Sequence, residues 1–285
     1  MRKHILATML MGVLTVVSTS CNKDGSNTPN NQSDANSVSN AQSNDAGNPD
    51  ASNDCAKFQG QCIDAGSIVT FGNYPQATND PEPLQWRVLE IDSTKQKVFL
   101  LSEYVIDVKP YEAIKKSVTW ETCSLRAWLN SDFMDAAFSA DEKQRIVTTH
   151  LTNPDNAFNG TSGGNDTDDN VFLLSLDDAR NPAYFTKGAE ITGIPLSEAT
   201  DPLPNQSARD ARTAKATTYA VNKNVLNTSP DECANVACST QWWLRSPGYD
   251  ESYGAHVGAW GDAPDDGRRA NNDRLGVRPA LWVKY

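Results

Sequence analysis

A long polar tract, Asn22 to Asp54, sets the strongest limit on what this chain can fold into, because it consists almost entirely of Asn, Ser, Asp, Ala, Gly and Pro. Such a tract cannot bury enough apolar surface to offset the entropy lost on ordering, so we expect it to be disordered. A folded domain therefore has to come from residues 55–285, a length that suits one or two domains. The simplest use of the tract is a flexible tether.

The residues before this tract have the order of a secretory signal. Positive charge in MRKH is followed by an apolar run, Ile5 to Val17, and then by small residues before Cys21. The run is shorter than the ~20 residues that a membrane-spanning helix needs. We therefore predict that residues 1–20 are a signal peptide and that the mature chain leaves the cytoplasm.

Cys21 directly follows the small residues, an arrangement that resembles a bacterial lipobox, although Ser18 stands where that pattern has leucine. The resemblance implies that Cys21 carries a lipid and that residues 21–54 are the anchor cysteine and its linker. The expected location is the cell envelope, on the extracytoplasmic side, at the outer membrane or the cell surface. An ordinary signal peptide and a secreted protein are the alternative.

The charge of the chain limits its partners. With 25 basic and 36 acidic residues the formal net charge is −11. A nucleic-acid partner needs clustered Lys and Arg, so we expect none. The balance suits a solvent-facing protein or one that binds cations.

Six cysteines in an exported chain favour disulfides. Cys55 and Cys62 are close in sequence, and so are Cys233 and Cys238, so two local disulfides are predicted, with Cys123 free and buried. Spacing alone does not prove this connectivity. Zinc is the rival interpretation, but the mature chain has few histidines and no Cys-x-x-Cys pair.

Strands are predicted in the first part of the folded region. Residues 67–76 form one expected strand. The apolar segments 84–92 and 97–106, joined by the polar DSTKQ, predict a hairpin. Both faces of this hairpin are partly apolar, which indicates a central position.

Helices are predicted after the hairpin. Apolar residues of 123–138 recur at helical spacing. A second helix is expected after Ser139, where Glu142 completes a capping box. A short strand is expected to run into a third helix capped at Ser175.

The C-terminal part divides into an irregular stretch and a strand-rich end. Residues 181–230 mix helix breakers with one weakly helical stretch and are expected to form a surface insertion. The segments WWLRSP, GAHVGAW and LGVRPALWVKY predict a closing antiparallel meander. In it, one of Trp242 and Trp243 packs inward and the other lies near the surface. The whole predicts one α+β domain over 55–285, with antiparallel strands and two or more helices.

Five sequence blocks occur in one order after Ser67: FGNYPQ with QWRVLEI; SEYVIDVKPY; TWETCSLRAWLN with DFMDAAFS; GTSGGNDTDDNVFLLSLDDA; and QWWLRSPG with GVRPALW. Together they resemble the bacterial DUF6273 family, a domain of unknown function, from about Ser67 to the C-terminus. This resemblance implies a shared fold but no established activity.

The ending, WLRS followed by a loop and GVRPALW, is similar to the close of the C-type-lectin-like and formylglycine-generating-enzyme superfamily. That likeness implies a C-type-lectin-like α+β fold with a last core strand at Gly276–Arg278 and a binding surface on irregular loops. It also implies an enzymatic alternative, in which Cys233 and Cys238 are the copper-binding redox pair of an oxidase.

The loop 163–170 holds the densest group of oxygen-bearing side chains: Asn165, Asp166, Asp168 and Asp169. Ca²⁺ prefers about six to eight oxygen ligands, so this loop is a tentative calcium site. The spacing is not that of an EF-hand. Turn chemistry before the strand at Val171 is the alternative interpretation.

Aromatic side chains next to Asp and Asn are the usual equipment of sugar binding and equally of an ordinary core. The predicted ligand surface consists of Trp243, Arg245, Tyr253, His256 and Trp260. For Arg245, and for Arg278, the guanidinium either contacts a ligand or locks the last strands together.

No complete catalytic constellation is found in the sequence, so no catalytic residue is assigned. The predicted function is a non-catalytic binding domain of a cell-envelope lipoprotein, with a carbohydrate, peptide or protein ligand. The oxidase and a structural envelope protein are the alternatives. The expected partners are the membrane, through the lipid anchor, and a glycan or an envelope protein; no cofactor is expected apart from the tentative calcium.

Overall fold

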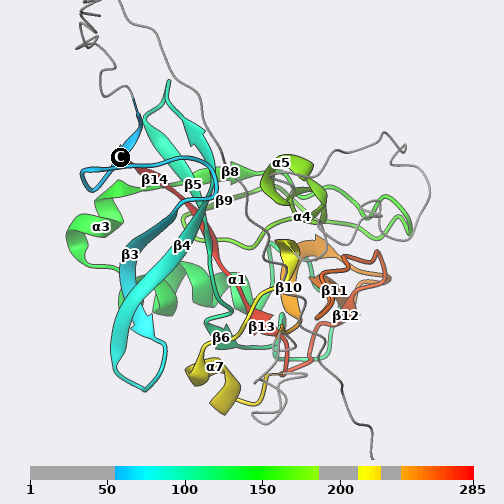
Figure 1. Ribbon diagram of the computed structural model, residues 1–285. Helices are drawn as coiled ribbons and strands as arrows, with labels where there is room; N and C mark the ends of the chain where they lie inside the picture. The colour runs from blue at the N-terminus through cyan, green and yellow to red at the C-terminus, as the bar shows by residue number, and fades with distance from the viewer. Residues whose placement is uncertain (1–54, 186–210, 226–238) are drawn as a thin grey trace, which may run out of the picture. The chain divides into compact units, whose positions relative to one another are not determined.

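The computed structural model describes residues 55–185, 211–225 and 239–285, which all belong to one compact unit, Asn53–Tyr285 (Figure 1). The predicted signal peptide, Cys21, the polar tract and the pair Cys233 and Cys238 lie outside these described residues. Within the described ranges, no helix is long and apolar enough to cross a membrane.

The first of two five-stranded sheets has the order β3-β4-β5-β14-β7, with every neighbour antiparallel. Its strands are β3 (Ile68–Pro75), β4 (Pro81–Asp92), β5 (Lys97–Ser102), β14 (Ala280–Lys284) and β7 (Ile146–Val147). The predicted strand at 67–76 and the predicted hairpin are confirmed. A register shift between Val88 and Glu90 interrupts the simple alternation, so Val88 and Leu89 are both buried.

The second sheet has the order β12-β11-β10-β13-β6. Its strands are β12 (Arg268–Arg269), β11 (Tyr253–Val257), β10 (Trp242–Pro247), β13 (Gly276–Val277) and β6 (Asp107–Val108). The expected antiparallel pairing of β10 with β11 is confirmed. In contrast, β13 runs parallel to β10.

The predicted closing meander is therefore wrong in its last part. The segment LGVRPALWVKY does not stay in one sheet, because β13 belongs to the second sheet and β14 to the first. The chain crosses between the sheets at Arg278 and Pro279. A proline has no N–H to give to a ladder, which favours an interruption of pairing at this point.

Buried Arg278 fixes this crossing. Its Nε donates to the carbonyl oxygen of Ser102 at 2.8 Å, its Nη1 donates to that of Arg212 at 3.4 Å, and its guanidinium lies over the ring of Trp242. Burial lowers the pKa of Arg278 to about 10. Of its two predicted roles, Arg278 thus fills the architectural one.

A buried segment, 171–174, lies next to strands of both sheets. Phe172 pairs with Ala280 of β14, and the carbonyl oxygen of Leu174 accepts a hydrogen bond from the backbone N–H of Arg245 in β10. The segment runs into α4 (Leu176–Arg180), which begins at a capping box formed by Ser175 and Asp178. The predicted helix cap at Ser175 is confirmed.

The predicted helix at 123–138 is also confirmed, as α1 (Ser124–Trp128), the wide π turn η1 (Leu129–Phe133) and α2 (Met134–Ala137). The capping box of Ser139 and Glu142 opens α3 (Ala140–Arg145) as predicted. The Glu142 carboxylate also accepts from the backbone N–H of Gly72 at 2.9 Å, so α3 caps part of the edge strand β3.

The remaining described elements are short: β1 (Lys57–Phe58), β2 (Gln61–Cys62), β8 (Thr149–Leu151), β9 (Thr167–Asp169), α5 (Pro182–Phe185) and α7 (Thr218–Asn222). The predicted disulfide between Cys55 and Cys62 is confirmed and closes the β1–β2 hairpin. Cys123 is free and buried, also as predicted.

Part of the expected surface insertion is packed inside the unit. Arg212 and Ala214 are buried, and Ala216 forms a bridge with Val105. An ion pair between the Lys223 ammonium and the buried Asp107 carboxylate, at 2.8 Å, also fixes this segment. Residues 186–210 and 226–230 of the expected insertion lie outside the described ranges.

Candidate functional site

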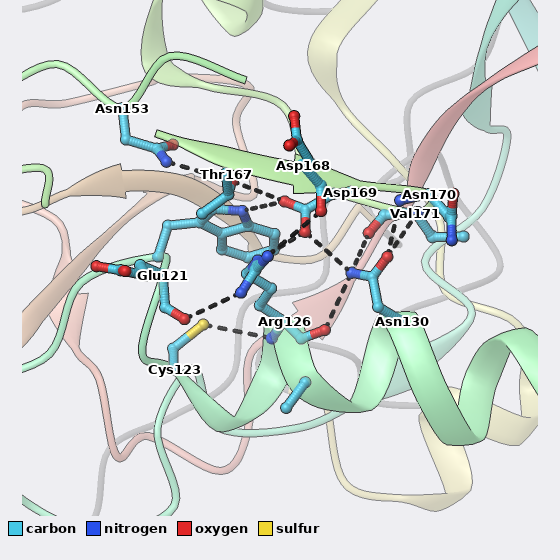
Figure 2. A network of polar contacts seen from close by, with 12 residues as sticks. Glu121, Cys123, Arg126, Asn130, Asn153, Thr167, Asp168, Asp169, Asn170 and Val171 are labelled. Atoms are coloured by element: carbon cyan, nitrogen blue, oxygen red, sulfur yellow. Dashed lines mark hydrogen bonds and ion pairs between the residues drawn. The ribbon is translucent and has the colours of Figure 1, made fainter. Parts of the chain in front are cut away.

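Asp169, one of the predicted calcium ligands, is buried, with its side chain 1% exposed. Figure 2 shows its carboxylate among its hydrogen-bonding partners. One of its carboxylate oxygens accepts from the Trp120 indole N–H at 2.8 Å and from the Thr167 hydroxyl at 2.9 Å. The other accepts from Nε of Arg126 at 2.6 Å. A charged partner and several donors thus offset the cost of burying this carboxylate.

Asn130 extends the same network toward the helix (Figure 2). Its side-chain oxygen accepts from the backbone N–H groups of Asn170 and Val171, and its side-chain nitrogen donates to the carbonyl oxygen of Val171 at 2.9 Å. The network therefore binds α1 and η1 to β9 and acts as scaffold.

The other predicted calcium ligands are exposed, and two of them contact the same histidine ring. Asp168 meets Nδ1 of His150 at 2.9 Å, Asp166 lies 3.5 Å from Nε2 of the same ring, and Asn165 donates to Glu121 at 3.0 Å. The hydrogen bond to Asp168, aided by the charge of Asp166, raises the pKa of His150 above its ordinary value. Among the described residues, no group of three or more His, Cys, Asp and Glu is placed to hold a metal ion.

The two adjacent tryptophans are both fully buried, so the expectation that one lies near the surface is wrong. Strand β10 is an inner strand, and both of its faces are covered. Trp243 packs on the Tyr111 ring and donates its indole N–H to the carbonyl oxygen of Lys109 at 2.8 Å, whereas Trp242 lies beneath Arg278. Trp243 cannot face a ligand in this arrangement.

Two more predicted ligand residues are internal. His256 is 2% exposed, and burial together with the charge of Arg268 lowers its pKa to about 3, so it is neutral at physiological pH. Arg245 pairs with Asp178 at 2.7 Å and donates to the carbonyl oxygen of Leu173 at 3.1 Å, which fastens α4 to β10. Arg245 thus fills its architectural role.

The last two predicted ligand residues do reach the surface. Trp260 is 77% exposed, and Tyr253 is partly exposed. Two further aromatic side chains are exposed without having been assigned to the site from the sequence: Tyr249 at 60% and Phe158 at 63%. The only sequence signal for Phe158 is an aromatic residue inside an Asn- and Gly-rich loop.

The name aromatic loop face is used here for these four aromatic residues, Phe158, Tyr249, Tyr253 and Trp260, which lie on loops linked by hydrogen bonds. The loops come from distant parts of the sequence, and side chains make the contacts between them. The Thr161 hydroxyl donates to the carbonyl oxygen of Tyr249 at 2.8 Å, and the rings of Tyr249 and Tyr253 meet edge to face.

Buried Asn156 is the hub that holds the loops together. Its side-chain nitrogen lies within hydrogen-bond distance of the carbonyl oxygens of Pro247, Gly248 and Asp265, at 3.1, 3.3 and 3.0 Å. Its side-chain oxygen accepts from the backbone N–H of Phe158 at 3.0 Å. One side chain thereby fixes the backbone beneath Phe158, Tyr249 and the loop after Trp260.

Two arginines form hydrogen bonds with the backbone of the loop 258–267. Arg180 donates to the carbonyl oxygen of Ala263 at 2.6 Å and pairs with the Asp265 carboxylate at 3.0 Å. Arg212 donates to the carbonyl oxygen of Gly261 at 2.6 Å. Gly267 has a positive φ of 70°, and a side chain there would collide with the backbone of Gly254, so this end of the loop requires glycine.

The arrangement presents aromatic rings on loops whose backbone is fixed by buried polar side chains. The loop 258–267 also carries the carboxylates of Asp262 and Asp266, the first partly and the second fully exposed. Flat apolar faces beside hydrogen-bonding groups are suited to holding an amphipathic ligand.

Residues 95–285 match the family model described as "Domain of unknown function (DUF6273)". The match covers more than half of the chain and begins in the turn before β5, so β3 and β4 precede it. No curated protein and no solved structure matches the chain.

Proposed function

The chain belongs to the DUF6273 family, and from this premise we propose that it is a non-catalytic carbohydrate-binding module of a cell-envelope lipoprotein. The ligand lies on the aromatic loop face. The lipid anchor is Cys21, and the folded unit lies on the extracytoplasmic side of the membrane.

One observation carries this proposal: Trp260, Phe158 and Tyr249 expose most of their side chains on loops that are held by Asn156, Arg180 and Arg212. Exposed apolar rings contribute little to the stability of the folded state, and where several lie together on a surface they mark an interaction site. Loops that are already fixed lose little entropy when a ligand binds.

A carbohydrate fits this face better than a peptide strand. Sugar rings offer apolar C–H faces to aromatic rings and hydroxyl groups to neighbouring carboxylates and amides. The likeness of the chain's ending to C-type-lectin-like domains supports the same interpretation, since a binding surface on irregular loops is what that likeness implies. We include the C-type-lectin-like fold in the proposal.

A glycan array probed with the full chain, with and without Ca²⁺, tests the proposal. We expect binding that Trp260→Ala or Tyr249→Ala weakens at least about tenfold, because rigid aromatic residues dominate small interfaces. The matched control is Ile68→Ala, which removes an exposed apolar side chain from β3. If the wild-type chain binds no glycan in either condition, the proposed function is wrong.

The anchor has its own test. A Cys21→Ala variant should not be labelled by fatty acid in cells and should move from the membrane fraction to the soluble fraction. Unchanged membrane association of this variant would contradict the lipoprotein part of the proposal.

A further inference from the structure

Basic side chains gather on one part of the second sheet and the segments next to it. They lie in the loop 109–116, at the end of α7, and along β12 and the turn after it: Lys109, Lys115, Lys116, Lys223, Arg268, Arg269 and Arg274. We name this group the basic face. It is unexpected in a chain whose net charge is −11.

Backbone contacts show that the three segments are neighbours. The N–H of Glu112 donates to the carbonyl oxygen of Ala270 at 2.9 Å, and the N–H of Lys109 donates to that of Leu275 at 3.3 Å. Nε of Arg274 donates to the carbonyl oxygen of Asn224, beside Lys223, at 3.3 Å. The segments that carry the basic face therefore adjoin one another, and Arg268 and Arg269 alternate across β12.

Two carboxylates of this region are inside, not on the surface. Asp107 is fully buried and pairs with Lys223, and Glu112 is 3% exposed and pairs with Lys116 at 3.4 Å. The exposed carboxylates close by are those of Asp250, Glu251 and Asp273, and the pKa of Asp250 is lowered by hydrogen bonds from Ser252 and by the charge of Arg269. Basic side chains still outnumber acidic ones on the basic face.

The three arginines are exposed, and none of them forms an ion pair with any described carboxylate. Neutral groups orient them instead. Arg268 donates to the Gln241 side-chain oxygen at 3.2 Å, and the Arg269 guanidinium lies over the ring of Tyr253. Among the described residues these guanidinium groups have no ion-pair partner within salt-bridge distance, while the charge of Arg269 acts on the Asp250 carboxylate.

We propose that the basic face binds the carboxylate groups of an acidic polysaccharide. This inference rests on the proposed function and names its ligand class. The planar guanidinium fork matches a carboxylate in a bidentate way, and charge-assisted hydrogen bonds are the strong ones. A polymer with a charge on each sugar can meet several of these arginines at once.

The link between the two faces is Tyr253. It belongs to the aromatic loop face, pairs with Arg269 across β11 and β12, and packs against the guanidinium of Arg269. A sugar at Tyr253 would therefore have its acidic group next to Arg269.

A negatively charged membrane offers a similar field of charge. Binding to anionic vesicles is therefore measured beside binding to the polysaccharide.

The experiment measures binding to polygalacturonate on a biosensor and uses the full chain with Cys21→Ala, so that no acyl chain contributes. We expect binding that weakens as NaCl is raised from about 0.05 M to about 0.5 M, because salt screens exposed charges. Arg268→Gln, Arg269→Gln and Arg274→Gln combined should weaken it at least about tenfold. The matched control combines Lys57→Gln, Lys95→Gln and Lys284→Gln, which removes the same charge elsewhere and should leave affinity within about twofold.

Several results would overturn the inference. No binding to polygalacturonate, or equal binding to neutral dextran, contradicts recognition of charge. Equally tight binding to polyglutamate or to phosphatidylglycerol vesicles contradicts recognition of a saccharide. If neutral glycans still bind in a manner sensitive to Trp260→Ala, the proposed function stands while this inference fails; if no glycan binds at all, both fail.

Discussion

Two aspartate-rich loops of this protein, 163–170 and 258–267, have similar compositions and use their residues in opposite ways. In the first loop a carboxylate turns inward: Asp169 is buried and joins Trp120 to Arg126. In the second loop the backbone is held from within, by Arg180 and other buried side chains, and Trp260 turns outward.

The difference teaches how a polar loop becomes scaffold or surface. When the side chains of a loop make its buried hydrogen bonds, few of those side chains remain free to contact a ligand. A loop whose carbonyl groups make those bonds keeps its side chains free while its backbone stays fixed. Composition does not distinguish the two cases.

The largest expected effect is a loss of stability in the loop 163–170, where Asp169 is buried. Asp169→Asn removes the charge that compensates Arg126 inside the protein and should lower the free energy of unfolding by about 3–5 kcal/mol. Urea unfolding followed by circular dichroism measures this. The control is Asp168→Asn, an exposed neighbour that should cost no more than about 0.5 kcal/mol. Equal losses for the two variants would remove the distinction between them.

The second effect concerns the loop 258–267, whose backbone is hydrogen-bonded to buried side chains such as Asn156. Asn156→Ala leaves buried carbonyl groups without their donor and should cost about 1–3 kcal/mol of stability. It should also weaken glycan binding, since the loops beneath Phe158 and Tyr249 lose their fixed geometry. The control is Asn159→Ala in the same loop, because the Asn159 side chain makes one hydrogen bond to the described residues, to the carbonyl oxygen of Asp265 at 3.5 Å. Full glycan affinity in Asn156→Ala would show that the hub does not prepare the site.

A smaller effect concerns the exposed edge of the first loop. The Asp168 carboxylate raises the pKa of His150, so the protonated ring is favoured in the folded state. This stabilising contribution is complete below the ordinary pKa of histidine and is lost as the pH rises through the folded-state pKa. In an NMR titration, Asp168→Asn should lower the pKa of His150. The buried His256, with a pKa of about 3, should not titrate between pH ~5 and ~8. An unchanged His150 pKa would contradict the contact.

The smallest expected effect is that of calcium on the first loop. Because the oxygens of Asp169 already accept hydrogen bonds from protein groups, Ca²⁺ should raise the melting temperature by less than about 1 °C at millimolar concentration. Differential scanning fluorimetry with Ca²⁺ and with EDTA measures this. A clear rise that Asp168→Asn abolishes would restore the calcium site and make the two loops more alike than we infer.

The sequence predicted those parts of the fold that depend on neighbours in the chain. The hairpin of β4 and β5, the capping boxes at Ser139 and Ser175 and the disulfide of Cys55 with Cys62 all follow from residues a few positions apart. Their hydrogen bonds and apolar spacing are local, so the pattern of residues is enough to identify them.

The site was predicted only in part, because exposure depends on what the rest of the chain covers. Trp260 was correctly expected at the surface, while Trp243 and His256 were placed there wrongly. Phe158 and its hub Asn156 were missed. Asn156 acts through carbonyl groups about ninety and more residues away, and no local pattern records such contacts.

By itself, then, the sequence determined the mixed α+β class, the local elements and the family resemblance. Tertiary structure alone decided that the final segment divides between two sheets at Arg278, that both adjacent tryptophans are internal, and that Asp169 belongs to the scaffold. The physical reason is that strand partners and burial are set by contacts between distant segments, whose free energies compete across the whole unit.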